Sequence, residues 1–193
     1  MNILQKQIVK DFVFRIDNKR CDKIIKTIRP YLHKSDKILD VGSGFCTVSK
    51  RLKDMGHTVT SLDVKDRSLY EQISVTLYDG VKIPFKTDSF DVVLVITVLH
   101  HIKDPEKILK EAKRVAKKII IMEDTYESTR QKYLTFAMDS IVNMELLNHP
   151  HTNKSDKVWR NLFNRHNLII KAVLTHNYWR FFTSTTYFLE KTN

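Results

Sequence analysis

The stretch KILDVGSGFCTVSKRL, residues 37–52, decides the fold. Its first five residues form a short apolar run that contains Asp40 and is followed directly by Gly42. This pattern predicts a buried parallel strand that enters a tight turn. Residues 45–55 then show helical spacing of apolar residues, and Gly56 stands where a helix C-cap favours glycine. We therefore predict a strand–turn–helix unit.

Strand and helix patterns alternate outward from this unit. Further strands are expected over residues 57–64, 74–78, 89–98 and 117–124, with helices over 66–73 and from Asp104-Pro105 to about residue 115. Such alternation is typical of a parallel sheet with helices on both faces. With two later strands, at 168–175 and 184–190, the pattern predicts an α/β, Rossmann-like, doubly wound, mostly parallel seven-stranded sheet.

The flanks of this core are expected to be helical, except for the C-terminal end. Helices are predicted over residues 2–14, 19–33, 127–147 and 155–166, and the last two strands should form an antiparallel C-terminal hairpin at the edge of the sheet. We predict a single domain over residues 1–193. It comprises N-terminal helices (1–34), a cofactor-binding core (35–125) and a substrate-side region with the terminal hairpin (126–193).

Polar residues gather where the predicted strands end. In an open α/β sheet, ligands bind beyond the carboxyl ends of the strands, where the strand order reverses. The residues at these ends are Asp40, Asp63, Asp79, Thr97 and Glu123. We therefore expect one binding rim at this edge of the sheet.

Two of the four glycines, Gly42 and Gly44, fall in the first strand-to-helix turn. Glycine there permits left-handed backbone and close approach of a ligand, and the following helix N-terminus favours a carboxylate. Asp63 stands at the end of the second strand, where a carboxylate can accept bonds from both hydroxyls of a ribose. Asp79-Gly80 fits either an adenine contact or a plain turn.

With these residues noted, residues 37–52 resemble the VLDxGxG-type segment of class I S-adenosyl-L-methionine (SAM)-dependent methyltransferases. Residues 79–115, DGVKIPFKTDSFDVVLVITVLHHIKDPEKILKEAKRV, are similar to the ubiquinone/menaquinone-biosynthesis-like branch, methyltransferase type 11. One departure is Cys46, which replaces the third turn glycine of the family. The resemblance implies SAM as cofactor, with the methionine part near the first turn, the ribose at the second strand, the adenine at the third, and the fourth strand lining the pocket. The residues that it assigns to the cofactor are Asp40, Gly42, Ser43, Gly44, Asp63, Val64, Asp79, Gly80 and Thr97.

Methyl transfer needs a general base only if the acceptor carries a proton that must leave. His100 and His101 follow the fourth strand and are the catalytic candidates, because imidazole titrates near neutral pH; packing between helix and sheet is the alternative reading. Glu123 and Asp124 come next. We expect no metal, because His149 and His151 have no third ligand at fixed spacing. The aromatic run at 178–182 fits either an acceptor wall or core packing.

Charge and composition limit the classes of acceptor that the sequence favours. The net charge of +11 is concentrated at the ends: residues 1–40 hold ten basic and five acidic residues, and residues 150–193 hold seven and two. Such ends would attract phosphates or anionic lipid head groups, or are simply solvated surface. Two cysteines in unrelated contexts and the absence of a signal peptide favour the cytoplasm.

We therefore expect methyl transfer to a small-molecule acceptor, such as a lipid, a quinone-like compound or another metabolite, at oxygen or carbon. An anionic acceptor would suit the charge. The alternatives are a nucleic-acid methyltransferase that uses the basic ends and a non-catalytic SAM-binding module. No transmembrane segment is expected, and a peripheral membrane contact and the oligomeric state stay open.

Overall fold

A computed structural model describes residues 3–128, 131, 153–178 and 182–192; for residues 3–13, 178 and 182 only the backbone is considered. The helices are α1 (Ile3–Ile28), α2 (Thr47–Asp54), α3 (Pro105–Val115) and α5 (Asp156–Arg165), with 3-10 turns η1 (Arg29–Tyr31) and η2 (Leu99–His101). The strands are β1 (Lys37–Val41), β2 (Thr58–Asp63), β3 (Val75–Leu77), β4 (Phe90–Ile96), β5 (Ala116–Thr125), β6 (Leu168–Tyr178) and β7 (Phe182–Lys191).

The seven strands form one sheet in the order β3-β2-β1-β4-β5-β7-β6. Strands β1 to β5 pair in parallel, and β7 pairs antiparallel with both β5 and β6. The strand order reverses between β1 and β4, which is the place where an open α/β sheet binds its ligand. The predicted fold class is confirmed, with one refinement: the antiparallel strand β7 lies one place inside the edge, which β6 occupies.

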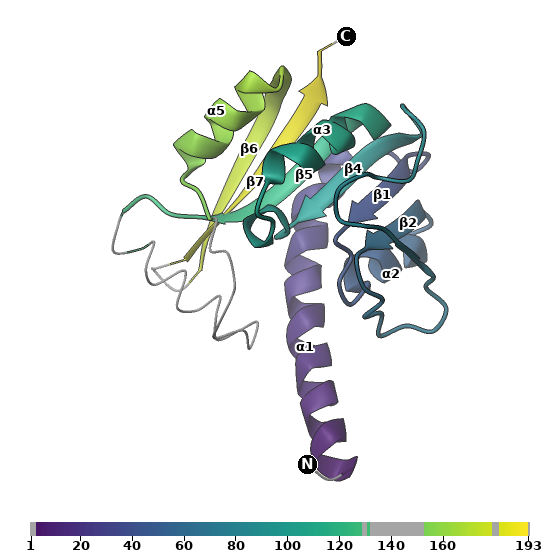
Figure 1. The fold of residues 1–193 in the computed structure, drawn as a ribbon. Coiled ribbons are helices and arrows are strands. Elements are labelled where there is room, and N and C mark those ends of the chain that lie inside the picture. The colour runs from purple at the N-terminus through teal and green to yellow at the C-terminus, as the bar shows by residue number, and fades with distance from the viewer. Residues whose placement is uncertain (1–2, 129–130, 132–152, 179–181, 193) are drawn as a thin grey trace.

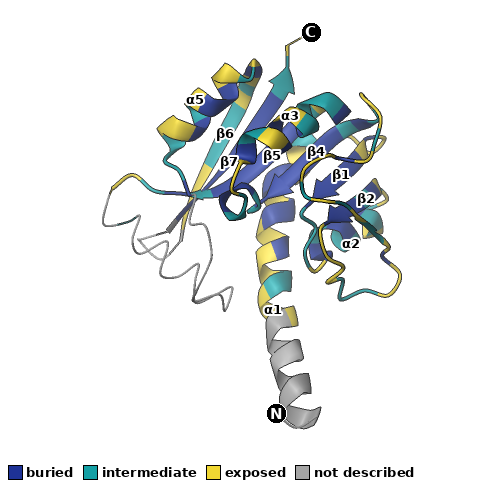
Figure 2. Cartoon of the chain, viewed as in Figure 1, coloured by how far each residue is buried: buried dark blue, intermediate teal, exposed yellow. Residues whose placement is uncertain are grey.

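Helices cover both faces of the sheet (Figure 1). On one face, α3 and α5 pack on a core that includes Val93, Leu109 and Trp159. On the other face, Ile24 and Ile28 of α1 lie in a second core. The central strands β1, β4 and β5 are mostly buried, as their dark colour in Figure 2 shows. A parallel strand that is covered twice must be apolar on both sides, which explains the unbroken apolar run of β4.

The first predicted helix boundary is wrong. Residues 2–14 and 19–33 were expected to form two helices, but α1 is continuous from Ile3 to Ile28. No proline or glycine interrupts residues 3–28, so the backbone has no reason to break there. The helix ends where Pro30 lies in the following 3-10 turn.

The helix predicted over residues 66–73 is also wrong, because this segment forms turns. Asp66 Oδ1 accepts a hydrogen bond from the Ser68 amide at 3.0 Å, and Ser68 Oγ accepts one from the Tyr70 amide at 3.1 Å. Short polar side chains that bond nearby amides compete with helix formation. The segment therefore becomes a loop after β2.

Most of the other expected elements are confirmed within a few residues. The helix predicted over residues 127–147 and most of the aromatic run at 178–182 lie outside the described residues. Among the residues that are described, no helix is both long and apolar enough to cross a bilayer.

Candidate functional site

The loop between β1 and α2 lies beyond the carboxyl ends of the central strands. Gly42 has φ +71°, and a Cβ built there would lie 2.4 Å from Cγ2 of Val98, which follows β4. The Gly42 and Ser43 amides donate to the Leu62 carbonyl of β2, at 2.8 and 3.2 Å. This turn therefore draws together the ends of β1, β2 and β4, and only a residue without a side chain fits at Gly42.

Gly44 and Asp63 are joined by a hydrogen bond. The Gly44 amide donates to Asp63 Oδ2 at 2.8 Å, and the Lys65 amide donates to Oδ1 at 3.2 Å. Gly44 has φ +52°, and a Cβ added to it would meet nothing closer than the Gly42 carbonyl oxygen at 4.0 Å, so the space beside it is open. A carboxylate at the end of β2 is thus fixed in place next to an open glycine turn.

The end of β3 joins the same rim. The Tyr78 amide donates to the Asp63 carbonyl at 3.2 Å, and a Cβ at Gly80 would lie 3.2 Å from Cγ1 of Val64. Asp79 is exposed, and its Oδ1 accepts bonds from the Val81 and Lys82 amides at 2.8 and 2.9 Å. These backbone bonds lower the pKa of Asp79. The plain turn reading of Asp79-Gly80 therefore holds, and its position beside Val64 also suits an adenine contact.

Asp40 lies beneath this rim rather than on its surface. It is buried, and its Oδ2 accepts a bond from Ser49 Oγ of α2 at 2.6 Å; Ser61 Oγ donates to Ser49 Oγ at 2.8 Å. Burial raises the pKa of the Asp40 carboxyl to about 6, while the bond from Ser49 opposes this shift and the nearby Asp63 adds to it. A carboxylate in this setting gains most from a cation placed close to it.

The N-terminus of α2 contains an unsatisfied hydroxyl. Thr47 is 5% exposed, and its Oγ1 has no hydrogen-bond partner among the described residues. Cys46, with φ +62°, caps this helix in the left-handed conformation that favours glycine, so the departure from the family pattern costs backbone strain. Free amides and a free hydroxyl at a helix N-terminus suit the carboxylate of an amino acid.

Helix α1 supplies residues that sequence analysis missed. Arg20 donates a hydrogen bond to Thr97 Oγ1, and Thr97, with φ +53°, itself bonds the Ile96 carbonyl at 2.7 Å. Asp17 lies 3.9 Å from Arg20, and its buried Oδ2 has no hydrogen-bond partner within the described part of the chain. Arg20 and Thr97 are 77 residues apart, so no local pattern could have linked them.

The two catalytic candidates differ in burial. His100 is 2% exposed, and its Nδ1 lies 2.5 Å from Glu123 Oε2. The other oxygen of Glu123 accepts the Val98 and Leu99 amides, at 3.0 and 2.7 Å. His101 is half-buried, with its ring centroid 4.0 Å from that of His100. Glu123 therefore holds the turn after β4, and His101 is the more accessible imidazole.

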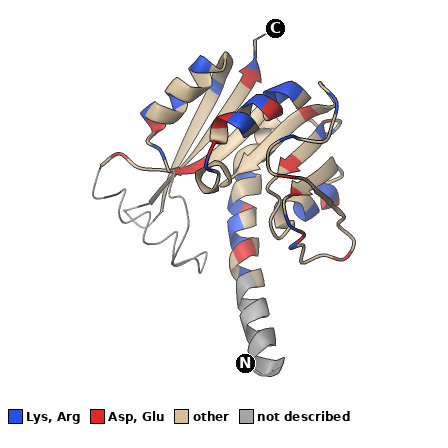
Figure 3. Cartoon of the chain, in the orientation of Figure 1, with Lys and Arg blue, Asp and Glu red and all other residues tan. Residues whose placement is uncertain are grey.

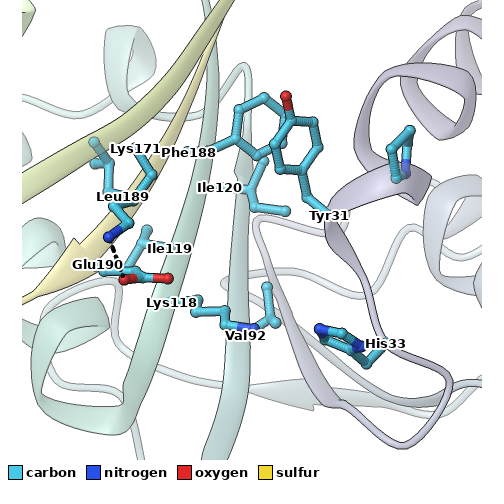
Figure 4. Close-up of a pocket in the computed structure, with 11 residues that line it drawn as sticks. Tyr31, His33, Val92, Lys118, Ile119, Ile120, Lys171, Phe188, Leu189 and Glu190 are labelled. Atoms are coloured by element: carbon cyan, nitrogen blue, oxygen red, sulfur yellow. Dashed lines mark ion pairs between the residues drawn. The ribbon is translucent and has the colours of Figure 1, made fainter.

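A cavity of about 240 Å³ lies away from this rim (Figure 4). Its lining includes Tyr31, Val92 and Lys118, and Lys171 forms an ion pair with Glu190 at 3.3 Å. Val92 and Lys118 stand in the amino-terminal halves of β4 and β5. Parallel sheets bind ligands at their carboxyl ends, so this cavity is not the expected cofactor site.

The residues present fit SAM. The turn after β1 leaves open space beside Gly44 for a methionine moiety, the Thr47 hydroxyl has no partner within the described part of the chain, and the buried carboxylate of Asp40 suits an ammonium group. Asp63 is 4% exposed, and each of its oxygens accepts one amide bond and retains acceptor capacity for a ribose. Val64 and Val81, which are 51% and 50% exposed, offer apolar contact for a base. These donors, acceptors and apolar groups occur in the order that such a molecule requires.

Comparisons with known proteins agree with this fold. The family model described as "Methyltransferase domain", Methyltransf_11, matches residues 39–119. A SAM-dependent methyltransferase from Methanosarcina mazei has the same fold, with a TM-score of 0.67, 18% identity, and coverage of 86% of this chain and 98% of that one. The magnesium protoporphyrin IX methyltransferase of Synechocystis, solved with bound SAH, gives a TM-score of 0.67 at 14% identity, with coverage of 100% and 89%.

The fold is that of the Rossmann-like SAM-dependent methyltransferases. Within that class, residues 39–119 of this chain are similar to the methyltransferase domain of type 11, and this similarity implies SAM as the cofactor.

The matches to the curated relatives cover only part of each protein. The demethylmenaquinone methyltransferase of Streptomyces griseus is 29% identical over 119 residues, which are 55% of this chain and 52% of that protein. The ubiquinone biosynthesis O-methyltransferase of Pelagibacter ubique is 26% identical over 153 residues, 75% and 58% respectively. The chain thus spans little more than half the length of these relatives.

Proposed function

We propose that this protein transfers the methyl group of SAM to a small-molecule acceptor with a quinone-like or phenolic ring, at oxygen or carbon. The observation that carries the proposal is the bond between the Gly44 amide and Asp63, which places a carboxylate and an open glycine turn together at the switch point of the sheet. The names of the curated relatives support the acceptor class.

Bound SAM supplies a methyl group on a sulfonium, which is already activated for transfer. The chain's own task is to fix that group in line with the acceptor and to exclude water. Asp63 and the turn at Gly42–Gly44 orient the nucleoside and methionine ends. Arg20 and Thr97 lie at the end of β4, beside the expected approach of the acceptor.

A hydroxyl acceptor must lose its proton as its oxygen attacks the methyl carbon and the carbon–sulfur bond breaks. His101 is the proposed proton acceptor, because it is half-buried beside the end of β4. His100 is buried against Glu123 and is assigned a positioning role.

Asp63→Asn tests the cofactor site. We expect SAM affinity to fall by about 1–3 kcal/mol, because charge-assisted bonds to the ribose are lost. Isothermal titration with SAM and with SAH measures the change. Asp54→Asn is the control, since this carboxylate is exposed at the far end of α2 and pairs with Lys50 at 2.6 Å.

Two results would count against the proposal. Folded wild-type protein that binds neither SAM nor SAH would remove the cofactor, and unchanged affinity in Asp63→Asn would remove Asp63 from the site. Once binding is established, labelled SAM and a panel of hydroquinones and catechols test the acceptor class. Transfer to RNA or DNA instead would support the nucleic-acid alternative.

A further inference from the structure

The outward face of α1 carries a line of exposed basic residues. Arg15, Lys19, Lys23 and Lys26 are exposed and follow one another at intervals of four, four and three residues. Such spacing places them on one side of a helix. The opposite side contains Cys21, Ile24, Ile25 and Ile28, which are buried in the core. The basic line therefore faces solvent; Figure 3 shows where basic residues lie along the described part of α1, with acidic residues among them.

Few acidic groups neutralise this face. Within the described part of the chain, none of the ion pairs found involves Arg15, Lys19 or Lys26. Asp22, the acidic residue at the margin of the line, already pairs with Arg51 of α2 at 2.7 Å. The face therefore presents a strong local positive charge, which attracts an extended anionic partner.

An exposed apolar residue lies on the same face. Ile16 is 52% exposed and precedes Lys19 and Lys23 by three and seven residues. A helix that combines basic residues with large apolar residues is typical of attachment to the membrane interface. The aromatic residue described nearby, Phe14, contacts Tyr70 instead, with centroids 6.2 Å apart.

The helix also has the right place in the molecule. Figure 1 shows α1 running past the carboxyl ends of the parallel strands, with its N-terminus far from the sheet. Arg20 of the same helix bonds Thr97 at the rim. A surface that bound the outward face of α1 would therefore lie on the side of the molecule where the acceptor is expected to enter.

We infer that the outward face of α1 docks the protein on an anionic lipid surface. The basic residues bind lipid phosphates, and Ile16 inserts among the head groups. This contact does not depend on methyl transfer, but it gives the proposed enzyme access to an acceptor dissolved in the bilayer. A nucleic acid would use the same charges but would gain little from Ile16.

The test is vesicle co-sedimentation of the full chain. Wild-type protein should bind vesicles of phosphatidylcholine with phosphatidylglycerol, should bind pure phosphatidylcholine weakly, and should release the anionic vesicles at high salt. The variant Lys19→Glu/Lys26→Glu should bind at least about tenfold more weakly, because each basic residue near an anionic surface contributes to the attraction. The control, Lys110→Glu/Lys157→Glu, makes the same charge change on α3 and α5, which cover the other face, and should bind like wild type.

Ile16→Ser distinguishes an anionic lipid surface from a nucleic acid as the partner. It should weaken vesicle binding several-fold and leave the salt dependence unchanged. Equal vesicle binding by wild type and Lys19→Glu/Lys26→Glu would overturn the inference. Gel-shift binding to RNA or duplex DNA that this charge variant abolishes, without binding to vesicles, would also overturn it. SAM titration of the same variants should give wild-type affinity, so a failure of docking is distinct from a failure of the proposed function.

Discussion

The two sides of the binding rim are built differently. On the cofactor side, the ends of β1, β2 and β3 meet through backbone amides, glycines and one carboxylate, with Gly44 bound to Asp63 and Gly80 beside Val64. On the acceptor side, the turn after β4 is held by the buried carboxylate of Glu123, which reaches over from β5. The first side leaves open space beside Gly44, whereas the second is built around a buried carboxylate that accepts bonds from its neighbours.

This difference indicates that the two sides have separate roles, one in holding the cofactor and one in keeping a rigid turn beside the acceptor. A cofactor that is common to a family can be held by short turns whose geometry is set by glycine and aspartate. The acceptor side must keep a rigid turn next to a variable cavity, and a buried carboxylate with three donors provides that rigidity. Variants on the two sides should therefore fail in different ways.

Glu123→Ala should have the largest effect. It would leave the Val98 and Leu99 amides and His100 Nδ1 without their acceptor in a buried place. We expect a loss of about 3–5 kcal/mol in the free energy of unfolding, because removing one partner of a buried charged network is costly. Urea denaturation measures the loss.

The matched control for that variant is Glu190→Ala, on the neighbouring strand β7. Its side chain is 39% exposed and pairs with Lys171, so the change should cost less than about 1 kcal/mol. Equal losses in the two variants would show that Glu123 does not hold the turn, and the contrast between the two sides would then fail.

Gly42→Ala should have the next largest effect, on the cofactor side. The added Cβ would lie 2.4 Å from Val98 Cγ2, at a backbone φ of +71°. We expect a loss of about 2–4 kcal/mol in stability, from overpacking together with left-handed strain, and loss of measurable SAM binding. Circular dichroism during urea unfolding and calorimetric titration with SAM check the two expectations.

Two further variants separate the backbone strain at Gly42 from the steric clash with Val98. Gly44→Ala has a positive φ but open space, so it should show the strain alone, about 1 kcal/mol. Val98→Ala in the Gly42→Ala background should recover part of the stability by removing the clash. If the double variant is no more stable than Gly42→Ala, Val98 is not the obstacle.

The turns on the proposed cofactor side could be predicted from the sequence because their signals are local. Gly42, Gly44, Asp63 and Gly80 each lie in a short turn directly after a strand, and apolar runs locate the strands. Parallel pairing then brings the strand ends to one edge. The burial of Asp40 was not foreseen, because its partner Ser49 belongs to the next helix and neither residue is unusual by itself.

The acceptor side was harder to predict because its contacts are distant in sequence. His100 and Glu123 are 23 residues apart, and Arg20 and Thr97 are 77 apart. Sequence analysis named His100 and His101 together as bases, but only burial separates a histidine packed against a carboxylate from a more accessible one. The continuous helix α1 was divided between residues 14 and 19 in the prediction, although no proline or glycine interrupts residues 3–28 and the backbone has no reason to break there.

Asp40 offers the effect that is most specific to pH. Burial raises the pKa of its carboxyl from 3.8 to about 6, so the folded protein binds this proton more tightly than the unfolded chain. The stabilising contribution of the protonated form is therefore fully present below about pH 4 and is lost as the pH rises through 6. Relative to pH 4, we expect ionised Asp40 at pH 7 to cost about 2–3 kcal/mol.

Asp40→Asn isolates this effect, because the amide does not titrate and still accepts the bond from Ser49 Oγ. The difference in unfolding free energy between wild type and Asp40→Asn should shift in favour of the variant as the pH rises from 4 to about 7. A difference that is constant with pH would contradict the shifted pKa. If a cation of the cofactor lies against this carboxylate, saturating SAM should lower the pKa of Asp40 and reduce the shift, whereas Asp54→Asn should show neither effect. The pH dependence would thereby report whether the buried acid beneath the rim belongs to the cofactor site or only to the fold.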